Sequence, residues 1–545
     1  MLTMSQAVLP PVFLVALVAP SLRAQDAADD GGAARVIVRF RADSSLARSN
    51  GLSPQGAVAA RAEALGARLG LALSAGAAVS GLAQVVFASG VTSAELAERL
   101  ALESDVAYAV PDERRRIVGA PNDPLYAAGV TGSSPEAGQW YLRAPSGEVA
   151  SSSNVEGAWA VTTGSPDIVV AAVDTGVRYE HPDLLSVAAG GHLLPGYDMI
   201  TDPAGANDGD GRDADASDPG DWLTRAELSR PGSSLFRCAT SPSSSSWHGT
   251  QLSGLVAALT DNGVGMAGAA PGARVLPVRV LGKCGGYDSD IVAGMRWAAG
   301  LGVPGAPANP HPARVINLSL GGDGACSAAY QEAVDEITAA GTVIVAAVGN
   351  SSGHAVASPA NCRGVIAVAG LRHAGTKVGF SSLGPEVAIS APGGNCVNTA
   401  ADSACLYPIL TATDAGETVP AGSTYTDSYN TSVGTSFSTP LVAAAAALVL
   451  SVHSEMTPQE VTRLLQATAR PFPPLGSVLS SSSAPECTAP QYNLMSTPVD
   501  QLECYCTTAT CGAGMLDAGA ALGAAGSAEP ERERPRPEPT TGKGR

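Results

Sequence analysis

Five short apolar runs constrain the fold of this 545-residue chain more than any other feature. In chain order they are DIVVAAVD, RVLPVRVLG, RVINLSLG, TVIVAAVGN and VIAVAG, all between residues 167 and 370. None of them alternates apolar with polar residues, which is typical of strands buried on both faces of a sheet. Stretches with helical patterns stand at 249–259, 289–299, 328–340, 438–453 and 458–468. The sequence therefore predicts an α/β fold, with a doubly wound, mainly parallel sheet and helices on both faces.

The segments before and after this region have other characters. Residues 1–24 contain the apolar stretch VFLVALVA and predict a signal peptide, with a disordered leader as the alternative. Residues 25–119 combine strand-like runs such as RVIVRF with Ala- and Leu-rich helical stretches, and predict a small separate α+β domain. Residues 120–525 then form the main domain. Residues 526–545 are rich in Pro, Glu and Arg and predict a disordered tail.

Charge and composition exclude two classes of partner. The chain has 50 acidic and 32 basic residues, a formal charge of -18, which argues against nucleic acid because phosphates need clustered Lys and Arg. The longest apolar runs, near 12–19 and 441–450, are shorter than the roughly 20 residues that a membrane span requires. The 10 cysteines all lie between Cys238 and Cys511, and this even, confined count favours disulfides in a secreted protein.

Three polar residues stand where predicted strands end or helices begin. Asp174 closes the run DIVVAAVD, His248 opens HGTQLSGLVAAL, and Ser436 lies at the start of GTSFSTPLVAAAAALVL. Each alone has a structural explanation, as a turn former, an exposed histidine or a helix N-cap. Together they supply an orienting acid, a base and a nucleophile, because a serine hydroxyl needs a neighbouring imidazole to accept its proton. The order Asp, His, Ser differs from the orders of α/β-hydrolases and of chymotrypsin-like enzymes.

With these motifs the chain resembles the subtilisin-like serine proteases, the subtilase family, and in particular its secreted, disulfide-containing bacterial members. The resemblance spans about residues 140–521 and includes AAVDTGV, HGTQLSG, NLSLGG, AAVGN and GTSFSTP. One departure is Gln251-Leu252-Ser253, where the family usually has His-Val-Ala. The resemblance implies a monomeric, secreted serine endopeptidase that acts on polypeptides through an acyl-enzyme. It also implies a zymogen, whose pro-domain at 25–119 is an intramolecular inhibitor cleaved off near Gly119-Ala120. A catalytically silent subtilase scaffold and an acyl-ester hydrolase are the alternatives.

The resemblance also assigns roles around the three residues. Asn350, at the end of AAVGN, would donate to the developing oxyanion together with the backbone N–H of Ser436; a strand-end turn is the structural alternative. An extended substrate would lie between two backbone edges, formed by Ser319, Leu320 and Gly321 on one side and by Gly285 and Gly286 on the other. Ala357 is expected at the floor of the specificity pocket.

An acidic loop, NDGDGRDADASDPGD, predicts a structural calcium ion. Its six aspartates would repel one another unless a hard cation compensates them, and a solvated acidic loop is the alternative. They are Asp208, Asp210, Asp213, Asp215, Asp218 and Asp221. A second calcium site is implied by the resemblance, where Asp183 would meet the loop of residues 261–266, which begins at Asp261.

The order of the cysteines and their placement in predicted loops favour three disulfides. These are Cys238 with Cys284, Cys326 with Cys362, and Cys396 with Cys405. Pairing among Cys487, Cys504, Cys506 and Cys511 stays open. A metal site in the cluster formed by the last three is the alternative, but no histidine is interleaved with them.

Overall fold

The structure is a computed structural model, and it describes residues 34–47, 54–112, 120–127, 137–394, 407–427, 433–477 and 484–527. These residues form two compact units, one among the residues up to 117 and one from 118 onward. Each unit is described by itself. The predicted signal peptide, most of the predicted tail, the Gly119 side of the expected cleavage site, and Cys396 with Cys405 lie outside the described residues.

The first unit is a small α+β fold. Its antiparallel sheet has four strands in the order β2-β3-β1-β4. Val36, Val38 and Phe40 alternate along β1 toward the interior, where they form a core with the helix residues Leu65 and Leu96. The elements are β1 (Ala34–Phe40), the short 3-10 helix η1 (Ser45–Ala47), α1 (Pro54–Leu69), β2 (Leu73–Ser80), β3 (Ala83–Ala88), α2 (Ser93–Ala101) and β4 (Val106–Pro111).

The second unit is built on a sheet of seven strands in the order β11-β10-β9-β8-β5-β7-β6, and all neighbouring strands are parallel. Its strands are β5 (Val169–Asp174), β6 (Tyr197–Asp198), β7 (Arg274–Arg279), β8 (Val315–Leu318), β9 (Val343–Ala347), β10 (Val365–Leu371) and β11 (Ile389–Pro392). The five apolar runs coincide with β5, β7, β8, β9 and β10. The predicted parallel α/β sheet is therefore confirmed.

Helices cover both faces of this sheet, as predicted. Val170 and Ala172 face the core that contains α7 and α10, whereas Ala171 and Val173 face the core that contains α8 and α9. Both faces are apolar, which explains why the strand sequences do not alternate. The long helices are α7 (His248–Ala257), α8 (Asp288–Ala298), α9 (Ala328–Ala339), α10 (Thr435–Val452), α11 (Pro458–Ala467) and α12 (Ala518–Ser527).

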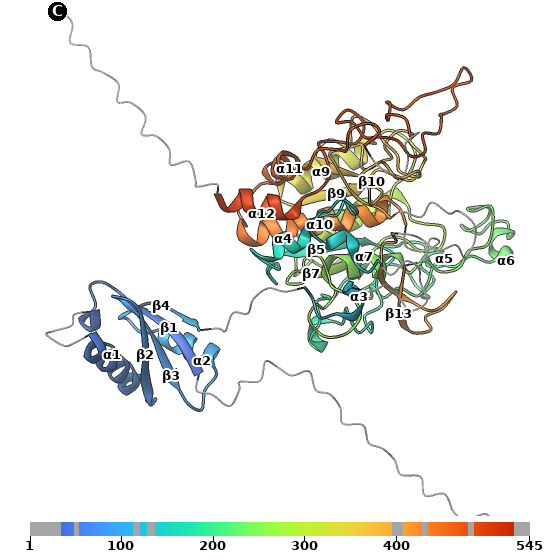
Figure 1. The fold of residues 1–545 in the computed structure, drawn as a ribbon. Helices are drawn as coiled ribbons and strands as arrows, with labels where there is room; N and C mark the ends of the chain where they lie inside the picture. Colours follow the sequence, from blue (N-terminus) through green and yellow to red (C-terminus); the bar gives the residue numbers. More distant parts are fainter. Residues whose placement is uncertain are drawn as a thin grey trace, which may run out of the picture. The chain divides into compact units, whose positions relative to one another are not determined.

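Helix α10 lies along the sheet beside β9 and β10, with α11 and α12 next to it (Figure 1). By length and composition alone α10 could cross a membrane, but 83% of its apolar window is buried inside the unit. It is therefore the central core helix of this unit.

Shorter elements connect this framework. They are α3 (Pro124–Ala127), η2 (Trp140–Leu142), α4 (Val155–Trp159), η3 (Val187–Ala189), α5 (Pro203–Ala206), α6 (Arg225–Leu228) and the antiparallel pair β12 (Thr411–Asp414) and β13 (Ser423–Thr426). The sequence reasoning did not predict β6, β11 or this pair.

Candidate functional site

Asp174 and His248 meet at the carboxyl end of the sheet. Asp174 is the last residue of β5, and His248 is the first residue of α7. The Nδ1 atom of His248 lies 2.9 Å from Oδ1 and 3.0 Å from Oδ2 of Asp174. The carboxylate is 1% exposed, and it also accepts the backbone N–H of Thr175 at 2.8 Å. Since an ionised carboxylate can only accept, Nδ1 carries the proton and Nε2 is left as an acceptor.

The surroundings of His248 raise the pKa of its imidazole. Burial lowers this pKa, but the charge and hydrogen bond of Asp174, together with the charges of Asp221 and Asp218, raise it by more. The imidazole is therefore a stronger base than an ordinary histidine side chain.

Ser436 lies in the first turn of α10, close to this pair. The ring of His248 packs edge-on against that of Phe437, the next residue, with 5.8 Å between ring centroids. The hydroxyl of Ser436 donates to the carbonyl oxygen of Ser319 at 3.1 Å, and no hydrogen bond joins it to His248 within the described part of the chain. Hydrogen bonds between catalytic groups often tighten only when substrate is bound.

Asn350 follows β9, and its amide is fixed by Thr435. The Oδ1 atom accepts the backbone N–H of Thr435 at 2.9 Å and its hydroxyl at 3.0 Å. A Cβ atom on Gly434 would lie 3.2 Å from Nδ2 of Asn350 and 3.7 Å from the backbone nitrogen of Ser436. Gly434 has φ 145°, so a glycine leaves this space open. Two nitrogen donors thus lie near one point, as an oxyanion requires.

A cavity of about 470 Å³ opens beside Ser436 and Asn350. All five residues expected to bind substrate through their backbone line it. The sequence reasoning missed the apolar side chains of Leu281, Ile291 and Tyr330, because they come from three separate elements and carry no motif. The complete lining is Leu281, Cys284, Gly285, Gly286, Asp288, Ile291, Ser319, Leu320, Gly321, Gly322, Tyr330, Ala347, Gly349, Asn350, Thr435 and Ser436.

Ala357, expected at the floor of this cavity, is not part of its lining. A Cβ atom on Gly321 would lie 3.3 Å from the Cβ of Ala357, and one on Gly349 would lie 3.2 Å from it. Ala357 therefore packs against two glycines of the cavity wall.

Three of the first four aspartates of the acidic loop have separate partners, and the remaining one is exposed. Asp208 pairs with Arg279 at 2.5 Å, and Asp210 is exposed. The carboxylate of Asp213 accepts the backbone N–H of Asp215 at 2.8 Å. The carboxylate of Asp215 accepts the backbone N–H of Ser217 at 2.9 Å. Among the described residues, no three carboxylates of this loop converge at metal-ligand distances. The described residues of this loop make these internal contacts, and the first metal prediction stays a prediction.

The last two aspartates of the loop contact the neighbours of the Asp–His pair. Asp218 accepts the hydroxyl of Thr175 at 2.7 Å, and Thr175 follows Asp174 directly. Asp221 accepts the backbone N–H and the hydroxyl of Ser246, at 2.6 and 2.8 Å. Burial raises the pKa of Asp218 to about 7. Both carboxylates therefore accept hydrogen bonds from donors within the protein.

The second expected metal site has a more suitable donor set. Asp183 accepts the side-chain amide of Asn262 at 3.2 Å and the backbone N–H of Met266 at 2.8 Å, so it meets the 261–266 loop as expected. Asp123, which the sequence reasoning missed, accepts the N–H groups of Asp261 and Asn262 at 2.9 and 3.3 Å. Burial raises the pKa of both Asp123 and Asp183, and the charge of Asp183 raises that of Asp123 further. Two buried carboxylates beside an amide suit a hard cation with oxygen ligands.

Four disulfides lie within the described residues. Cys238 is bonded to Cys284 and Cys326 to Cys362, as expected from the sequence. The open pairings are Cys487 with Cys504 and Cys506 with Cys511, so this cluster is cross-linked and does not offer thiolates to a metal. Because Cys284 lines the cavity, the first disulfide anchors the edge formed by Gly285 and Gly286.

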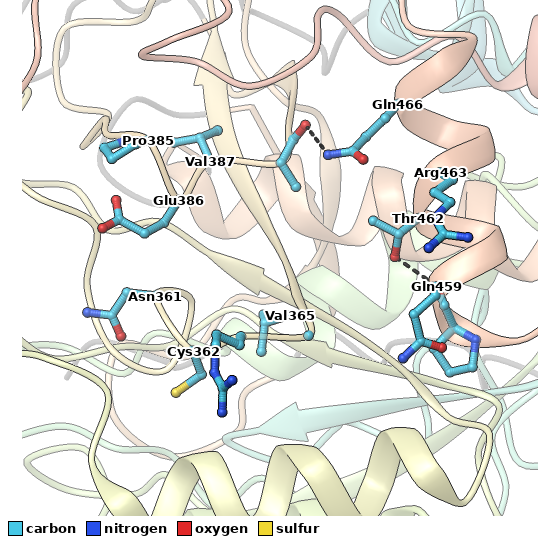
Figure 2. A pocket seen from close by; sticks show the side chains of 14 residues that line it. Asn361, Cys362, Val365, Pro385, Glu386, Val387, Gln459, Thr462, Arg463 and Gln466 are labelled. Atoms are coloured by element: carbon cyan, nitrogen blue, oxygen red, sulfur yellow. Dashed lines mark hydrogen bonds between the residues drawn. The ribbon is translucent and has the colours of Figure 1, made fainter.

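A second cavity of about 460 Å³ lies between the start of β10 and α11 (Figure 2). Val365 and Arg463 are among its lining residues, and Gln466 donates to the carbonyl oxygen of Ala388 at 3.3 Å. Its lining contains no histidine or serine, and Glu386 is its one carboxylate. This cavity lies at the opposite end of β10 from the Asp–His pair, and it offers no acid–base pair.

This parallel sheet, with helices on both faces and polar groups gathered at its carboxyl edge, has the fold of the subtilases. The sequence model of the subtilase family matches residues 165–492, and the chain belongs to this family. It is 44% identical over 322 residues to an extracellular protease of Xanthomonas campestris pv. campestris, covering 59% of this chain and 50% of that protein. It is 37% identical over 386 residues to an extracellular basic protease of Dichelobacter nodosus, and this match covers 69% of this chain and 56% of that protein.

A solved protease structure from Pseudoalteromonas arctica PAMC 21717 matches with a TM-score of 0.59 and 38% identity, covering 75% of this chain and all 100% of that one. The present chain spans about half the length of the two curated relatives, 50% and 56%.

Proposed function

We propose that the protein is a serine endopeptidase in which Ser436 attacks the carbonyl carbon of a peptide bond. The observation that carries this proposal is the pairing of Asp174 with His248 beside the start of α10. The carboxylate fixes the imidazole so that Nε2 can accept the serine proton. The raised pKa of His248 supports its role as the base.

The attack forms a bond from Oγ of Ser436 to the substrate carbon, while the serine proton moves to Nε2 of His248. The negative oxygen receives hydrogen bonds from Nδ2 of Asn350 and from the N–H of Ser436, and the positive end of α10 points at it. The imidazolium then gives its proton to the leaving amine as the peptide bond breaks. Water hydrolyses the remaining ester, with His248 again accepting the proton.

We place an extended polypeptide substrate in the 470 Å³ cavity. Backbone groups of residues 319–321 and 285–286 would pair with it on its two sides. Leu281, Ile291 and Tyr330 make apolar contacts with its side chains. These contacts support a preference for apolar residues on the acyl side of the cleaved bond.

We propose one structural calcium ion, held by Asp123, Asp183 and Asn262. It would offset the buried charges of the two carboxylates, which now depend on backbone and side-chain N–H donors. Asp261 holds the loop from the other side, since its carboxylate accepts the N–H of Asn122 at 3.1 Å. The ion would supply stability and take no part in the chemistry.

We further propose that residues 1–24 direct secretion, that residues 25–119 are a pro-domain, and that 120–525 are the mature catalytic domain. The relatives named as extracellular support secretion, and so do four disulfides, which form in oxidising compartments. The separate α+β fold of the first unit supports a pro-domain that inhibits the enzyme until it is removed. The mature protein acts as a monomer, without nucleic acid or membrane partners.

Labelling with a fluorophosphonate tests the proposal. The wild-type protein should form one covalent adduct on Ser436, and Ser436→Ala should form none. Hydrolysis of a casein and of a simple alkyl ester is then compared. An unlabelled wild-type protein would indicate a silent scaffold, and labelling with ester hydrolysis alone would indicate an acyl-ester hydrolase.

A further inference from the structure

A buried lysine lies behind the candidate oxyanion site. The side chain of Lys377 is 0% exposed. Its Nζ atom donates to the backbone carbonyl oxygens of Val378, Gly379 and Ser381, at 3.0, 3.1 and 2.9 Å. Burial lowers the pKa of this amine to about 7, and the charge of Glu503 opposes that shift. Because a neutral amine has only two N–H groups, the three acceptors favour the ammonium form.

The loop that surrounds this ammonium, residues 378–382, is hydrogen-bonded to the chain on both sides of Asn350. On one side, the N–H of Ser382 donates to the carbonyl oxygen of Gly349 at 2.9 Å. On the other, the N–H of Ser351 donates to the hydroxyl oxygen of Ser382 at 3.2 Å. Two further bonds run from the N–H of Ser352 to the carbonyl of Phe380 and from the N–H of Gly353 to that of Ser381, at 2.8 and 2.9 Å.

We propose that Lys377 is a positioning residue for the oxyanion site, because its ammonium holds the 378–382 loop in the shape that places the Asn350 amide. The inference rests on the proposed peptidase function. Within the described residues the hydrogen bonds of Nζ go to carbonyl oxygens of this loop, and the loop is bonded to residues 349 and 351–353, so the effect of Lys377 reaches Asn350 through the loop. Removing the ammonium takes one of two donors from the carbonyl oxygens of Val378 and Ser381, and among the described residues it leaves that of Gly379 without a donor, which favours a rearrangement of the loop. A shift of about 1 Å at a positioned group can cost about a hundredfold in rate.

A double-mutant cycle tests this coupling. Lys377→Met and Lys377→Arg are made in the wild-type chain and in Asn350→Ala, and kcat and KM are measured with a peptide substrate. In the wild-type chain, Lys377→Met should lower kcat about tenfold and change KM by less than about twofold, and Lys377→Arg should restore part of kcat. In Asn350→Ala, Lys377→Met should change kcat by less than about twofold, because the amide that it positions is already absent.

Arg470→Met is the matched control. Arg470 is also a partly buried cation that donates to backbone carbonyls, those of Ala150, Ser152 and Leu516. No hydrogen bond among the described residues joins its side chain to residues 349–353 or 378–382. Arg470→Met should lower the melting temperature and leave the kcat of the folded protein unchanged. An equal loss of kcat for Lys377→Met in both backgrounds would overturn the inference and leave the peptidase function intact.

Two further measurements distinguish failure of this inference from failure of the variant to fold and from failure of the proposed function. If Lys377→Met does not fold, Ser382→Ala removes one loop contact to Ser351 and should show the same non-additivity with Asn350→Ala. If the wild-type chain hydrolyses no peptide, the proposed function fails, and the side-chain amide NMR signal of Asn350 reports the positioning directly. That signal should shift in Lys377→Met and not in Arg470→Met; an unchanged signal would overturn the inference.

Discussion

Asp221 holds Ser246 through both oxygens of its carboxylate, at 2.6 Å to the backbone nitrogen and 2.8 Å to the hydroxyl. The hydroxyl oxygen of Ser246 in turn accepts the backbone N–H of His248 at 3.3 Å. The acidic loop therefore fixes the start of α7, where the proposed base His248 lies. The negative charge of Asp221 also raises the pKa of the His248 imidazole.

Asp221→Asn should lower the pKa of His248, because the negative charge of Asp221 favours the imidazolium. Catalysis requires neutral His248, so the acid limb of kcat/KM should move to lower pH. The measurement is the pH profile of peptide hydrolysis. Asp210→Asn removes the same charge from an exposed position of the same loop and should leave the limb in place. A limb that moves to higher pH in Asp221→Asn would contradict the electrostatic role.

Removing calcium should destabilise the protein if Asp123 and Asp183 hold it. An ion bound only to the native state stabilises it by about 2.7 kcal/mol at a hundredfold excess over Kd. Chelation should therefore lower the melting temperature of the wild type and change that of Asp183→Asn much less. Asp213→Asn, in the acidic loop, should respond to chelation like the wild type. An unchanged melting temperature, with no calcium found by elemental analysis, would exclude the ion.

Replacing Cys238 and Cys284 together by serine should loosen the substrate edge at Gly285 and Gly286. The bond closes a loop with a sequence separation of 46, so its loss should cost about 4 kcal/mol on the chain-entropy model. KM should rise more than kcat falls, because the edge binds substrate and does not touch the reacting atoms. The pair Cys506 and Cys511, with a separation of 5 and outside the cavity lining, is the control and should leave KM unchanged.

The pro-domain should stay attached when the proposed nucleophile is removed. If the protein cuts itself near Gly119-Ala120, secreted Ser436→Ala should keep residues 25–119, and the wild type should lose them. Intact mass after expression in a host without other secreted proteases makes this comparison. A Ser436→Ala protein trimmed at the same position would assign the cut to another protease.

Local pattern was enough to predict the main sheet and the Asp–His pair. The uniformly apolar run that ends in Asp174 predicts a buried parallel strand, and the carboxyl edge of such a sheet gathers its polar groups. β6 has two residues and β11 four, so neither carries a readable period.

Contacts between side chains that are distant in sequence could not be predicted. The high density of negative charge in the acidic loop predicts a metal site. That Thr175 and Ser246 donate hydrogen bonds to Asp218 and Asp221 could not be predicted, because these residues are not adjacent to the aspartates in the sequence. Ala357 packs against two glycines that line the cavity, Gly321 and Gly349. The role of Lys377 could not be predicted, because its three hydrogen-bond partners are backbone carbonyl oxygens, which every residue has.

The turnover of Ser436→Ala on a peptide substrate decides whether Ser436 is the nucleophile. With both proteins reduced to residues 120–525, the variant should have the melting temperature of the wild type, within a few degrees, since the Ser436 hydroxyl has one hydrogen-bond partner among the described residues. Its kcat should fall about a million-fold, the loss that follows removal of the nucleophile from a subtilisin triad. Turnover like that of the wild type, from protein free of contaminating protease, would contradict the account.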